Sequence, residues 1–358
     1  MSTMTRRRLF AGAAAAVAAL AVGIDTNAAR ATHTSVPAST TPRAARIGVS
    51  IGAADLMYRG AAWRDARLDE AVHLGANWLR TDANWAWIEG TRGVWSWAEL
   101  DGLVDACAAR HLRPLLVLGT IPTWARPTGT PETHGPTTPS QREGYSTFCS
   151  RVAARYRGRV THYEVWNEPN LPQFWSSPNT SNYAKLLKAA YPRIKAADPD
   201  ARVVAGGVGW GSTINTVGWY RDLYTHGCKP YFDIANTHPY QDPYWSRQGN
   251  WDSGELYYAA RIRQVMNQNG DSSTPLWGTE FGAPSSGDNS LAEDQHAQSL
   301  VGGRDLWFGR EPNSVLFLYT MRDRTPHGSA ERENYFGLTR ADGTPKPVHE
   351  QMRNWIFA

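Results

Sequence analysis

Short apolar runs alternate with longer segments of helical periodicity, and this alternation repeats eight times between residues 46 and 358. Strands are predicted at 46–51, 76–80, 113–118, 160–167, 202–206, 232–238, 275–280 and 314–320. Helices are predicted at about 62–74, 97–110, 140–157, 180–197, 216–226, 254–269, 292–309 and 346–356. Strands that each precede a helix are typical of parallel βαβ units. Eight such units predict an α/β fold, a single-domain (β/α)8 TIM barrel.

An open doubly wound sheet is the alternative architecture. It usually carries a glycine-rich phosphate or dinucleotide loop after its first strand, and no such loop follows residues 46–51. The connections after predicted strands are long, at 121–138, 239–252, 281–291 and 321–345, whereas those after helices are short. Barrel active sites are built from the loops that follow the strands. We therefore expect the functional site at that end of a barrel.

The first 31 residues have the features of an export signal peptide. A positive run, Arg6-Arg7-Arg8, precedes the mostly apolar stretch 11–24, and Ala29-Arg30-Ala31 is a small-x-small cleavage site. The arginine run indicates a twin-arginine signal, with a Sec signal as the alternative. The apolar stretch is shorter than the about 20 residues that a membrane span needs. Secretion without stable membrane insertion is therefore expected, and the Thr-, Ser- and Pro-rich residues 32–45 predict a flexible linker before a folded domain at 46–358.

Charge and cysteine content narrow the classes of partner. The chain carries a net charge of +4, of which residues 1–31 contribute +3 through four arginines and one aspartate, so the remainder is near +1. A nearly neutral domain gives no support for nucleic-acid binding. The cysteines Cys107, Cys149 and Cys228 form no CxxC motif, and no metal is expected. Cys107 and Cys149 fall in consecutive predicted helices and could form a disulfide; three buried free thiols are the alternative.

Two glutamates stand at the ends of predicted strands. Glu168 lies in the segment His-Tyr-Glu-Val-Trp-Asn-Glu-Pro-Asn (162–170), where the proline marks the end of the fourth strand. Glu280 closes the seventh strand, which lies opposite the fourth in an eight-stranded barrel. Two facing carboxylic groups are what the cleavage of a glycosidic bond requires. Glu164 has the same strand parity as Glu168 but lies about 13 Å further back, where a buried ion pair is expected.

The segments Trp-Asn-Glu-Pro-Asn (166–170) and Thr-Glu-Phe-Gly (279–282) resemble the clan of retaining (β/α)8 glycoside hydrolases. The resemblance is closest to glycoside hydrolase family 39, with the cellulase-like family 5 as a neighbour, and it covers about residues 46–358. It implies that Glu168 is the acid/base and that Glu280 is the nucleophile.

The same resemblance implies roles for residues around the two glutamates. Asn167 would bind the 2-hydroxyl of the substrate, and Arg80 would support the nucleophile. His238 and Tyr240 match a His-x-Tyr motif at the end of strand six. Strand eight departs from the family pattern, because many members have a tryptophan there as the floor of the −1 subsite. In this chain Tyr319 replaces that tryptophan, or the floor is built differently.

The tryptophan content, 16 residues, is unusually high and predicts exposed stacking surfaces as well as core positions. Trp124, Trp175, Trp210, Trp245 and Trp251 lie in the long loops after strands. Among them we single out Trp124, Trp175 and Trp245, together with Tyr319, as candidates to stack on sugar rings.

These features predict a secreted retaining glycoside hydrolase that cleaves a poly- or oligosaccharide by double displacement. No metal or organic cofactor is required, carbohydrate is the expected partner, and a monomer is expected. A transglycosylase that uses the same two glutamates is one alternative, and a catalytically inactive carbohydrate-binding barrel is another. The sugar and its linkage stay open, with endo action favoured by the aromatic loops.

Overall fold

The computed structural model describes residues 41–210 and 215–358. The predicted signal peptide, residues 1–31, and most of the predicted linker lie outside these ranges. The end of the predicted linker belongs to the folded domain, because Arg43 donates a hydrogen bond to the carbonyl of Trp355 over 3.0 Å. A short 3-10 turn, η1 (Ala44–Arg46), then leads into the first strand.

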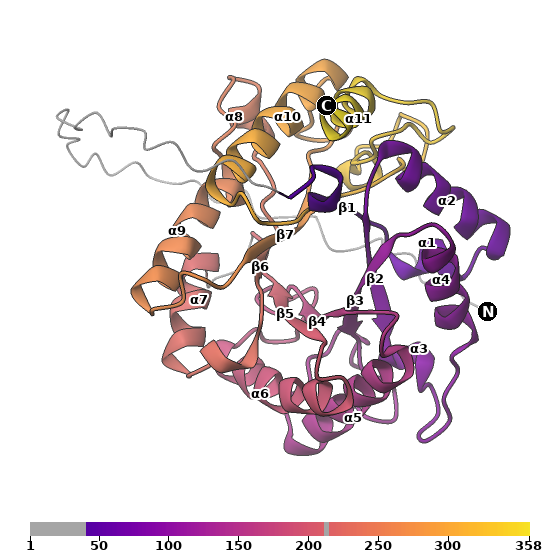
Figure 1. Cartoon of the computed structure of the whole chain (residues 1–358), viewed down its shortest axis with the longest axis vertical. Helices are drawn as coiled ribbons and strands as arrows, with labels where there is room; N and C mark the ends of the chain where they lie inside the picture. Colours follow the sequence, from indigo (N-terminus) through magenta and orange to yellow (C-terminus); the bar gives the residue numbers. More distant parts are fainter. Residues whose placement is uncertain (1–40, 211–214) are drawn as a thin grey trace. The chain divides into compact units, whose positions relative to one another are not determined.

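Eight parallel strands form a barrel, which confirms the predicted (β/α)8 TIM fold (Figure 1). They are β1 (Ile47–Ser50), β2 (Trp78–Asn84), β3 (Arg113–Gly119), β4 (His162–Asn167), β5 (Arg202–Gly207), β6 (Ala235–Thr237), β7 (Leu276–Phe281) and β8 (Leu316–Leu318). The hydrogen-bonded order is β5-β4-β3-β2-β1-β8-β7-β6. A parallel bridge between Val204 and Ile234 brings the two ends of this order together.

The helices surround the strands as an outer ring (Figure 1). The eight predicted helices are α2 (Ala61–Leu74), α4 (Ala98–Ala109), α5 (Pro139–Tyr156), α6 (Thr180–Ala197), α7 (Thr216–Thr225), α9 (Gly254–Gln268), α10 (Glu293–Arg310) and α11 (Pro347–Phe357). Every boundary differs from its prediction by at most one residue. Local signals explain this agreement: in α5, for example, Thr138 and Gln141 form a reciprocal capping box and Pro139 occupies the first turn.

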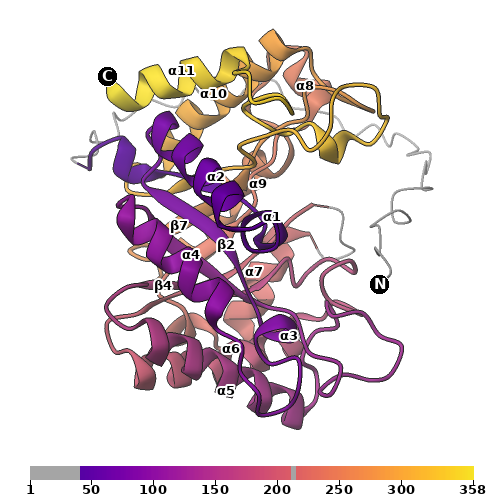
Figure 2. The same cartoon turned by 90° about the vertical axis from the view of Figure 1, so that its right-hand side faces the viewer.

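Besides η1, the described residues form three short helices and two 3-10 turns that the sequence patterns do not predict. The helices α1 (Ala53–Met57), α3 (Trp85–Ile88) and α8 (Pro243–Ser246) follow β1, β2 and β6, respectively. The 3-10 turns are η2 (Lys229–Tyr231) and η3 (Arg332–Asn334). The loops after β3 and β8 extend on the same side of the barrel as α3 and α8, which is on the right of Figure 2. This side is the carboxyl end of the strands, where the site was expected.

The inside of the barrel is built in layers. The lower layer is an apolar cluster of Trp78, Leu115, Val204, Ile234, Trp277, Val315 and Phe317. His162 stacks on Trp277 in this layer, with the ring centroids 5.0 Å apart. Two residues further along their strands, the inward positions are polar, with Arg80 on β2 and Glu164 on β4. The apolar layer therefore closes the barrel beneath a charged upper layer.

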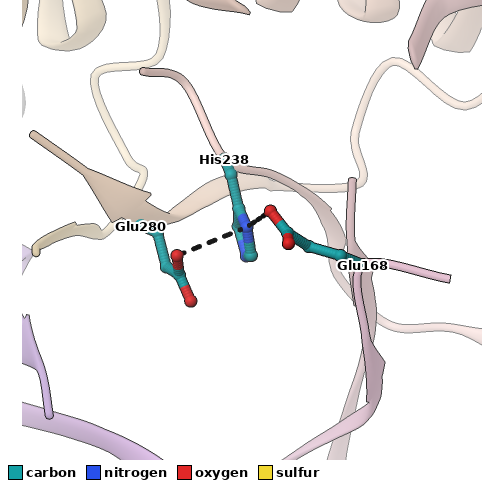
Figure 3. Close-up of side chains that lie close together, drawn as sticks. All are labelled: Glu168, His238 and Glu280. Carbon is teal, nitrogen blue, oxygen red and sulfur yellow. Dashed lines mark hydrogen bonds and ion pairs between the residues drawn. The ribbon is translucent and has the colours of Figure 1, made fainter. Parts of the chain in front are cut away.

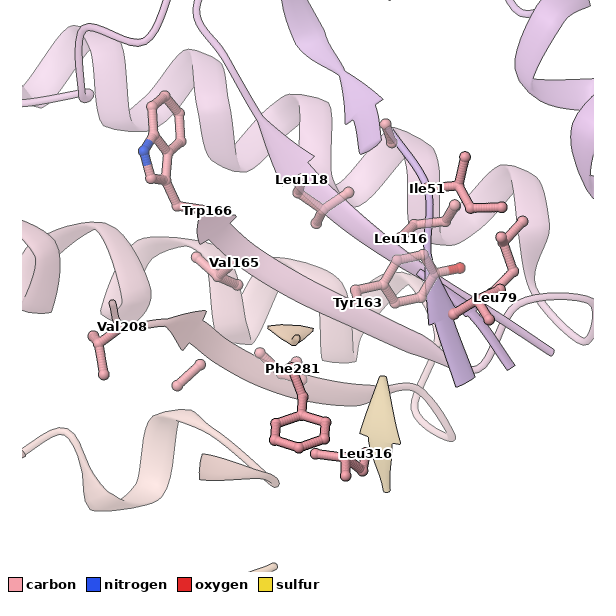
Figure 4. Packing of buried hydrophobic residues seen from close by; sticks show 14 of the residues in the cluster. Ile51, Leu79, Leu116, Leu118, Tyr163, Val165, Trp166, Val208, Phe281 and Leu316 are labelled. Atoms are coloured by element: carbon pink, nitrogen blue, oxygen red, sulfur yellow. The ribbon is translucent and has the colours of Figure 1, made fainter. Parts of the chain in front are cut away.

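Alternate residues of the same strands point outward and pack beneath the helices (Figure 4). They include Leu79, Leu116, Leu118, Tyr163 and Val165, all of which are fully buried. This outer core holds the helical ring against the strands. It leaves the loops at the carboxyl ends of the strands free to build a site.

The described residues include all three cysteines and the eight main helices. Cys107, Cys149 and Cys228 are buried free thiols, so the alternative of unpaired cysteines holds. Burial raises the pKa of all three, and that of Cys228 to about 11, which keeps the thiols protonated. Among the helices at 41–210 and 215–358, none is long and apolar enough to cross a bilayer.

Candidate active site

Glu168 and Glu280 meet at the mouth of the barrel (Figure 3). Glu280 lies in β7, and Glu168 is the first residue after β4. One carboxylate oxygen of each, together with a ring nitrogen of His238, lie within 4.8 Å of one another. Glu168 is 8% exposed, so the barrel mouth shields it from most of the solvent. The structure therefore brings the two sequence-predicted carboxylates together from opposite strands.

Arg80 on β2 lies below Glu280 and holds it in place. Its Nη1 donates to Oε1 of Glu280 over 2.5 Å and to Oγ of Ser50 over 3.2 Å. Its Nη2 donates to Oδ1 of Asn167 over 2.7 Å. The planar guanidinium thus connects Glu280 with the residue directly before Glu168. This geometry is the one that the resemblance implied for Arg80, and it orients the amide of Asn167 as well.

Glu164 anchors Arg80 from beneath. The two form a bidentate pair, with Nε to Oε2 at 2.8 Å and Nη2 to Oε1 at 3.0 Å. Glu164 also accepts a hydrogen bond from the backbone N–H of Gly207 over 3.0 Å and is fully buried. A buried ion pair at Glu164 was expected, but its partner is the arginine that contacts Glu280. Glu164 therefore belongs to the network of the site, which strand parity alone does not show.

His238 lies between the two glutamates and is fully buried (Figure 3). Its Nδ1 is 2.8 Å from Oε1 of Glu168 and 3.6 Å from Oε2 of Glu280. Tyr240, two residues later, donates its hydroxyl to Oε2 of Glu280 over 2.7 Å. The His-x-Tyr motif after β6 thus contacts both carboxylates.

The surroundings of the two glutamates shift their pKa values in opposite directions. Burial raises the pKa of Glu168, and the hydrogen bond from His238 offsets only part of this rise. Burial acts on Glu280 in the same sense, but the positive charges of His238 and Arg80 and the hydrogen bond from Tyr240 outweigh it. The pKa of Glu280 is therefore lowered. Compared with a free glutamate, Glu168 therefore holds its proton more strongly and Glu280 loses its proton more readily, which is the difference that an acid and a nucleophile require.

The backbone after β4 is shaped to present Glu168. Trp166 and Glu168 both have positive φ, at 70° and 42°, so the chain turns sharply at the end of the strand. The fully buried Asn170 then pairs with Gly209 after β5, through Nδ2 to the carbonyl at 2.7 Å and the N–H to Oδ1 at 3.2 Å. This pair joins the loop that follows Glu168 to the neighbouring strand.

Two glycines at the end of β5 leave room for the site. A Cβ on Gly207 would lie 2.1 Å from Nε2 of His238, and one on Gly209 would lie 2.3 Å from Oε1 of Glu168. Any side chain at either position would displace these groups. The sequence motifs that predict the site include neither of these glycines. The run Gly206-Gly207-Val208-Gly209 is a sequence signal of close backbone approach that could have found them.

Tyr319 lies beside Tyr240 at the end of β8. Their rings meet edge to face with centroids 6.0 Å apart, and Phe336 lies 5.7 Å from each. The Tyr319 hydroxyl donates to Glu333 and accepts a hydrogen bond from Arg324 over 2.7 Å. A tyrosine held by a charged pair thus lies directly after β8, and its role as the floor of the −1 subsite stays a prediction. No local sequence pattern selects Glu333 or Arg324, although both lie beside Tyr319.

Trp175 does not line the site. Its side chain is fully buried, with Trp166 at 5.4 Å and Tyr183 at 6.1 Å between ring centroids. A ring with no exposed face cannot stack on a sugar. The prediction that Trp175 is a subsite residue is therefore wrong, because the loop after β4 folds back and uses this indole as core.

The other candidate tryptophans differ in exposure. Trp124 is half-buried, and its Nε1 donates to the carbonyl of Glu89 over 2.7 Å. Trp251 is half-buried as well. Trp245 on α8 is 46% exposed and Trp210 after β5 is 71% exposed. Trp245 and Trp210 present free ring surface on the loop side of the barrel, and their contact with substrate stays a prediction.

The cluster of Glu168, His238 and Glu280 is the one group in the described part of the chain that could hold a metal ion. The contacts that Glu280 makes with residues outside this cluster do not suit a bound cation. Both oxygens of Glu280 already accept hydrogen bonds, from Arg80 and from Tyr240. A divalent ion there would lie against the guanidinium of Arg80. The expected metal-free reaction stays a prediction, which these contacts favour.

A TIM barrel that brings two carboxyl groups to within 5 Å at its mouth, one with a raised pKa and one with a lowered pKa, has the site of a glycoside hydrolase. The sequence profile described as "Glycosyl hydrolases family 39" matches residues 72–353. The chain therefore belongs to glycoside hydrolase family 39, as the resemblance had indicated.

The chain is also similar to known proteins, in sequence to a curated relative and in fold to solved structures. The chain is 28% identical over 280 residues to "Beta-xylosidase" of Geobacillus stearothermophilus, which covers 70% of this chain and 53% of that protein. It thus spans about half the length of this relative. A family 39 glycoside hydrolase of Bacteroides cellulosilyticus WH2 superimposes with a TM-score of 0.69 at 23% identity, over 87% of this chain and 63% of that one. GH5_18 of Streptomyces cattleya, from the neighbouring family 5, gives a TM-score of 0.68 at 17% identity, over 88% and 80%.

Proposed function

We propose that this protein is a secreted retaining glycosidase that cleaves O-glycosidic bonds of an oligo- or polysaccharide by double displacement. The observation that carries the proposal is the approach of the Glu168 and Glu280 oxygens to within 4.8 Å. Retaining enzymes hold their two carboxyl groups about 5–5.5 Å apart, whereas inverting enzymes leave about 6.5–9.5 Å for a water molecule. The spacing supports direct attack by Glu280 on the sugar.

In the first step Glu280 attacks the anomeric carbon while Glu168 gives its proton to the leaving oxygen. The bond to the leaving group breaks, and an ester forms between Glu280 and the sugar. Arg80 and Tyr240 keep Glu280 ionised before attack through the contacts described above. Asn167, oriented by Arg80, is the candidate to bind the 2-hydroxyl in the transition state.

In the second step the ester is hydrolysed. Esterification neutralises Glu280, which removes one of the charges that raise the pKa of Glu168. That pKa falls, so Glu168 can take a proton from water as the water attacks the anomeric carbon. Glu280 leaves as a carboxylate, and the sugar is released with its original anomeric configuration. His238 contacts both carboxylates, so it can respond to their change of charge in each step.

The test separates the two roles. Glu280→Ala should lower kcat by at least about 10⁴-fold on every substrate that the intact enzyme cleaves, because no ester can form. Glu168→Ala should slow substrates with poor leaving groups most, and azide should partly restore its turnover by trapping the glycosyl-enzyme. Labelling by a 2-fluoroglycoside should attach the sugar to Glu280, as seen by peptide mass spectrometry. Normal turnover by Glu280→Ala would contradict the assignment.

The substrate belongs to the proposal as well. Relatives named as a β-xylosidase and, over a short stretch, as an endoglucanase of Streptomyces lividans favour β-linked xylose or glucose chains for the first screen. NMR of the first-released sugar shows its anomeric configuration, which tests whether the reaction retains that configuration. A transglycosylase would give longer products at high acceptor concentration, and a carbohydrate-binding barrel would give no labelled ester. Export is tested by locating the mature protein and its N-terminus in culture.

A further inference from the structure

A second aromatic surface lies on the loop side of the barrel, near the ends of β1 and β2. Tyr58 follows α1, and Trp87 lies in α3 directly after β2. Their rings meet edge to face with centroids 4.7 Å apart. Tyr58 is 57% exposed, whereas Trp87 is half-buried against the core. Exposed tyrosine and tryptophan faces are surfaces on which the C–H face of a sugar can pack.

These rings border a small hollow of about 90 Å³. Its lining combines apolar and polar groups: Met57, Tyr58, Asn84, Trp87, Ile88, Ser96, Ala98, Glu99 and Leu100. A hollow of this size holds a few water molecules but not a whole sugar ring. It can receive hydroxyl or hydroxymethyl substituents, while a whole ring would rest on the aromatic side chains above it.

The polar lining suits hydroxyl groups. Glu99 is exposed in the first turn of α4 and supplies a carboxylate acceptor. Asn84 at the end of β2 has its Oδ1 fixed by the hydroxyl of Thr120 over 2.5 Å. A carboxylate and an oriented amide beside two aromatic rings are the mixed apolar and polar lining found in small-molecule sites. The lining contains no basic side chain that would attract an anion. The hollow therefore fits a neutral polyhydroxylated ligand.

The hollow shares a strand with the catalytic network. Asn84 lies four residues beyond Arg80 on β2, which is about 13 Å at the rise of a β-strand. Arg80 in turn contacts Glu280. The sugar that reacts at Glu280 cannot also rest on Trp87, but another unit of a longer chain can. A glycan that extends from the candidate active site along this side of the barrel is the occupant that fits this position.

We propose that Tyr58 and Trp87 form a distal subsite, which binds a sugar unit remote from the cleaved bond, so that the enzyme prefers chains of several sugars. The proposal rests on the proposed glycosidase function. According to this proposal, the loops after β1 and β2 give the enzyme its preference for longer substrates. The subsite acts through binding, and it takes no part in the bond-breaking steps.

The test compares substrates of different length. For the wild-type enzyme, kcat and KM are measured with an aryl monoglycoside and with the hexasaccharide of the same sugar, chosen from xylose and glucose series. Tyr58→Ala and Trp87→Ala should each lower kcat/KM for the hexasaccharide about tenfold, mainly by raising KM. The value for the aryl glycoside should change less than twofold. Tyr58→Phe, which keeps the ring, should restore hexasaccharide cleavage.

Tyr257→Ala is the matched control, because Tyr257 is an exposed tyrosine on α9 in the outer helical ring. It should leave both substrates unaffected. Equal losses on the two substrates in Tyr58→Ala would show a structural role for the ring and overturn the subsite. Unchanged hexasaccharide kinetics in both alanine variants would overturn it as well.

A binding experiment separates this proposal from the proposed function. Isothermal titration of the Glu280→Ala protein with the hexasaccharide needs no turnover. Adding Tyr58→Ala in that background should raise Kd about tenfold, or about 1.4 kcal/mol. An unchanged Kd would reject the subsite even for an active glycosidase. If the hexasaccharide binds through Tyr58 but the wild-type protein cleaves no glycoside, the proposed hydrolase function is wrong and the proposed binding surface stands.

Discussion

At the scale of single residues, Glu168 and Glu280 have the same side chain but different surroundings. Glu280 accepts hydrogen bonds from Arg80 and Tyr240, and it lies 3.6 Å from His238. Glu168 has His238 at 2.8 Å and is otherwise shielded from water. Activity requires Glu280 ionised and Glu168 protonated. We therefore expect a bell-shaped pH profile of kcat/KM, with an acidic limb below the usual glutamate pKa and an alkaline limb above it.

Tyr240→Phe should move the acidic limb of this profile to higher pH. The variant loses the hydrogen bond that lowers the pKa of Glu280, so that pKa rises and Glu280 becomes protonated at a higher pH. A hydrogen bond to a charged group contributes about 1.5–3 kcal/mol, and about 1.4 kcal/mol corresponds to one pKa unit. The acidic limb should move by about one to two pH units, with kcat/KM at the optimum about tenfold lower or more. The measurement is kcat/KM from pH 3 to 9.

Tyr319→Phe is the control for this experiment. Tyr319 lies next to Tyr240, but its hydroxyl contacts Glu333 and Arg324 instead of Glu280. Its acidic limb should stay where it is in the wild type, whatever happens to KM. If both variants shift the acidic limb equally, the hydrogen bond from Tyr240 to Glu280 does not determine the pH of that limb.

At the scale of elements, two loops bring groups from distant parts of the sequence to the site. The end of β5 and the residues that follow it approach His238 and Glu168 through Gly207 and Gly209, respectively, where a Cβ would overlap these two side chains. The segment after β8 brings Glu333 to Tyr319. A fully buried ion pair fixes this second segment. Lys346 contacts Oδ1 of Asp323 over 2.7 Å and Ser285 over 2.7 Å, so the two ends of the loop are joined.

Lys346→Met should destabilise the protein strongly. It leaves the carboxylate of Asp323 buried without its cation, and breaking a buried pair in this way costs about 3–5 kcal/mol. Burial already raises the pKa of Asp323 and lowers that of Lys346, which shows how unfavourable each charge is alone. The measurement is the free energy of unfolding from denaturant titration at pH 7.

The double variant Lys346→Met/Asp323→Asn is the matched control. The amide oxygen can still accept the hydrogen bond from the N–H of Gly337, now 2.9 Å from Oδ1, and no isolated charge remains. It should recover about half or more of the lost stability. A double variant no more stable than the single one would mean that Lys346 acts through packing instead of charge.

At the scale of the whole molecule, the layered interior separates stability from chemistry. The apolar lower layer around Trp78, Trp277 and Phe317 closes the barrel. The charged layer above it contains Arg80 and Glu164. Wide aromatic side chains fill the lower layer, with Trp78 and Trp277 at 5.2 Å between ring centroids. The polar network thus rests on a rigid apolar base, and the loops above it are free to differ among relatives.

Trp277→Ala should lower stability with little effect on the chemical steps. Removing a buried tryptophan leaves a cavity and costs about 3–5 kcal/mol. The catalytic groups lie in the layer above, so kcat at 15 °C should stay within about threefold of the wild type. Thermal unfolding and low-temperature kinetics measure the two effects. Trp245→Ala, at a half-exposed position, should change the unfolding free energy by less than about 1 kcal/mol. A large loss of kcat in folded Trp277→Ala would contradict this separation.

The sequence by itself determined the order of the eight strands and eight main helices, the limits of those helices to within one residue, and the ends of the strands that carry the two glutamates. Helix boundaries depend on nearby residues, such as Thr138 and Gln141 at the start of α5. Strand parity and Pro169 are equally local, so they placed Glu168 at the end of β4 without knowledge of the rest of the chain. The family resemblance then supplied Arg80 and Tyr240, whose contacts with Glu280 the structure contains.

Only the tertiary structure decided which side chains meet and which are exposed. The pairing of Glu164 with Arg80 joins two strands across the interior, and the contact of Asn170 with Gly209 joins two loops. Trp175 lies in a long loop but is core, because that loop packs back on the barrel. Such contacts depend on the tilt and stagger of the strands, which no short stretch of sequence encodes. The physical reason is that periodicity and capping act over a few residues, whereas burial is settled by the whole fold.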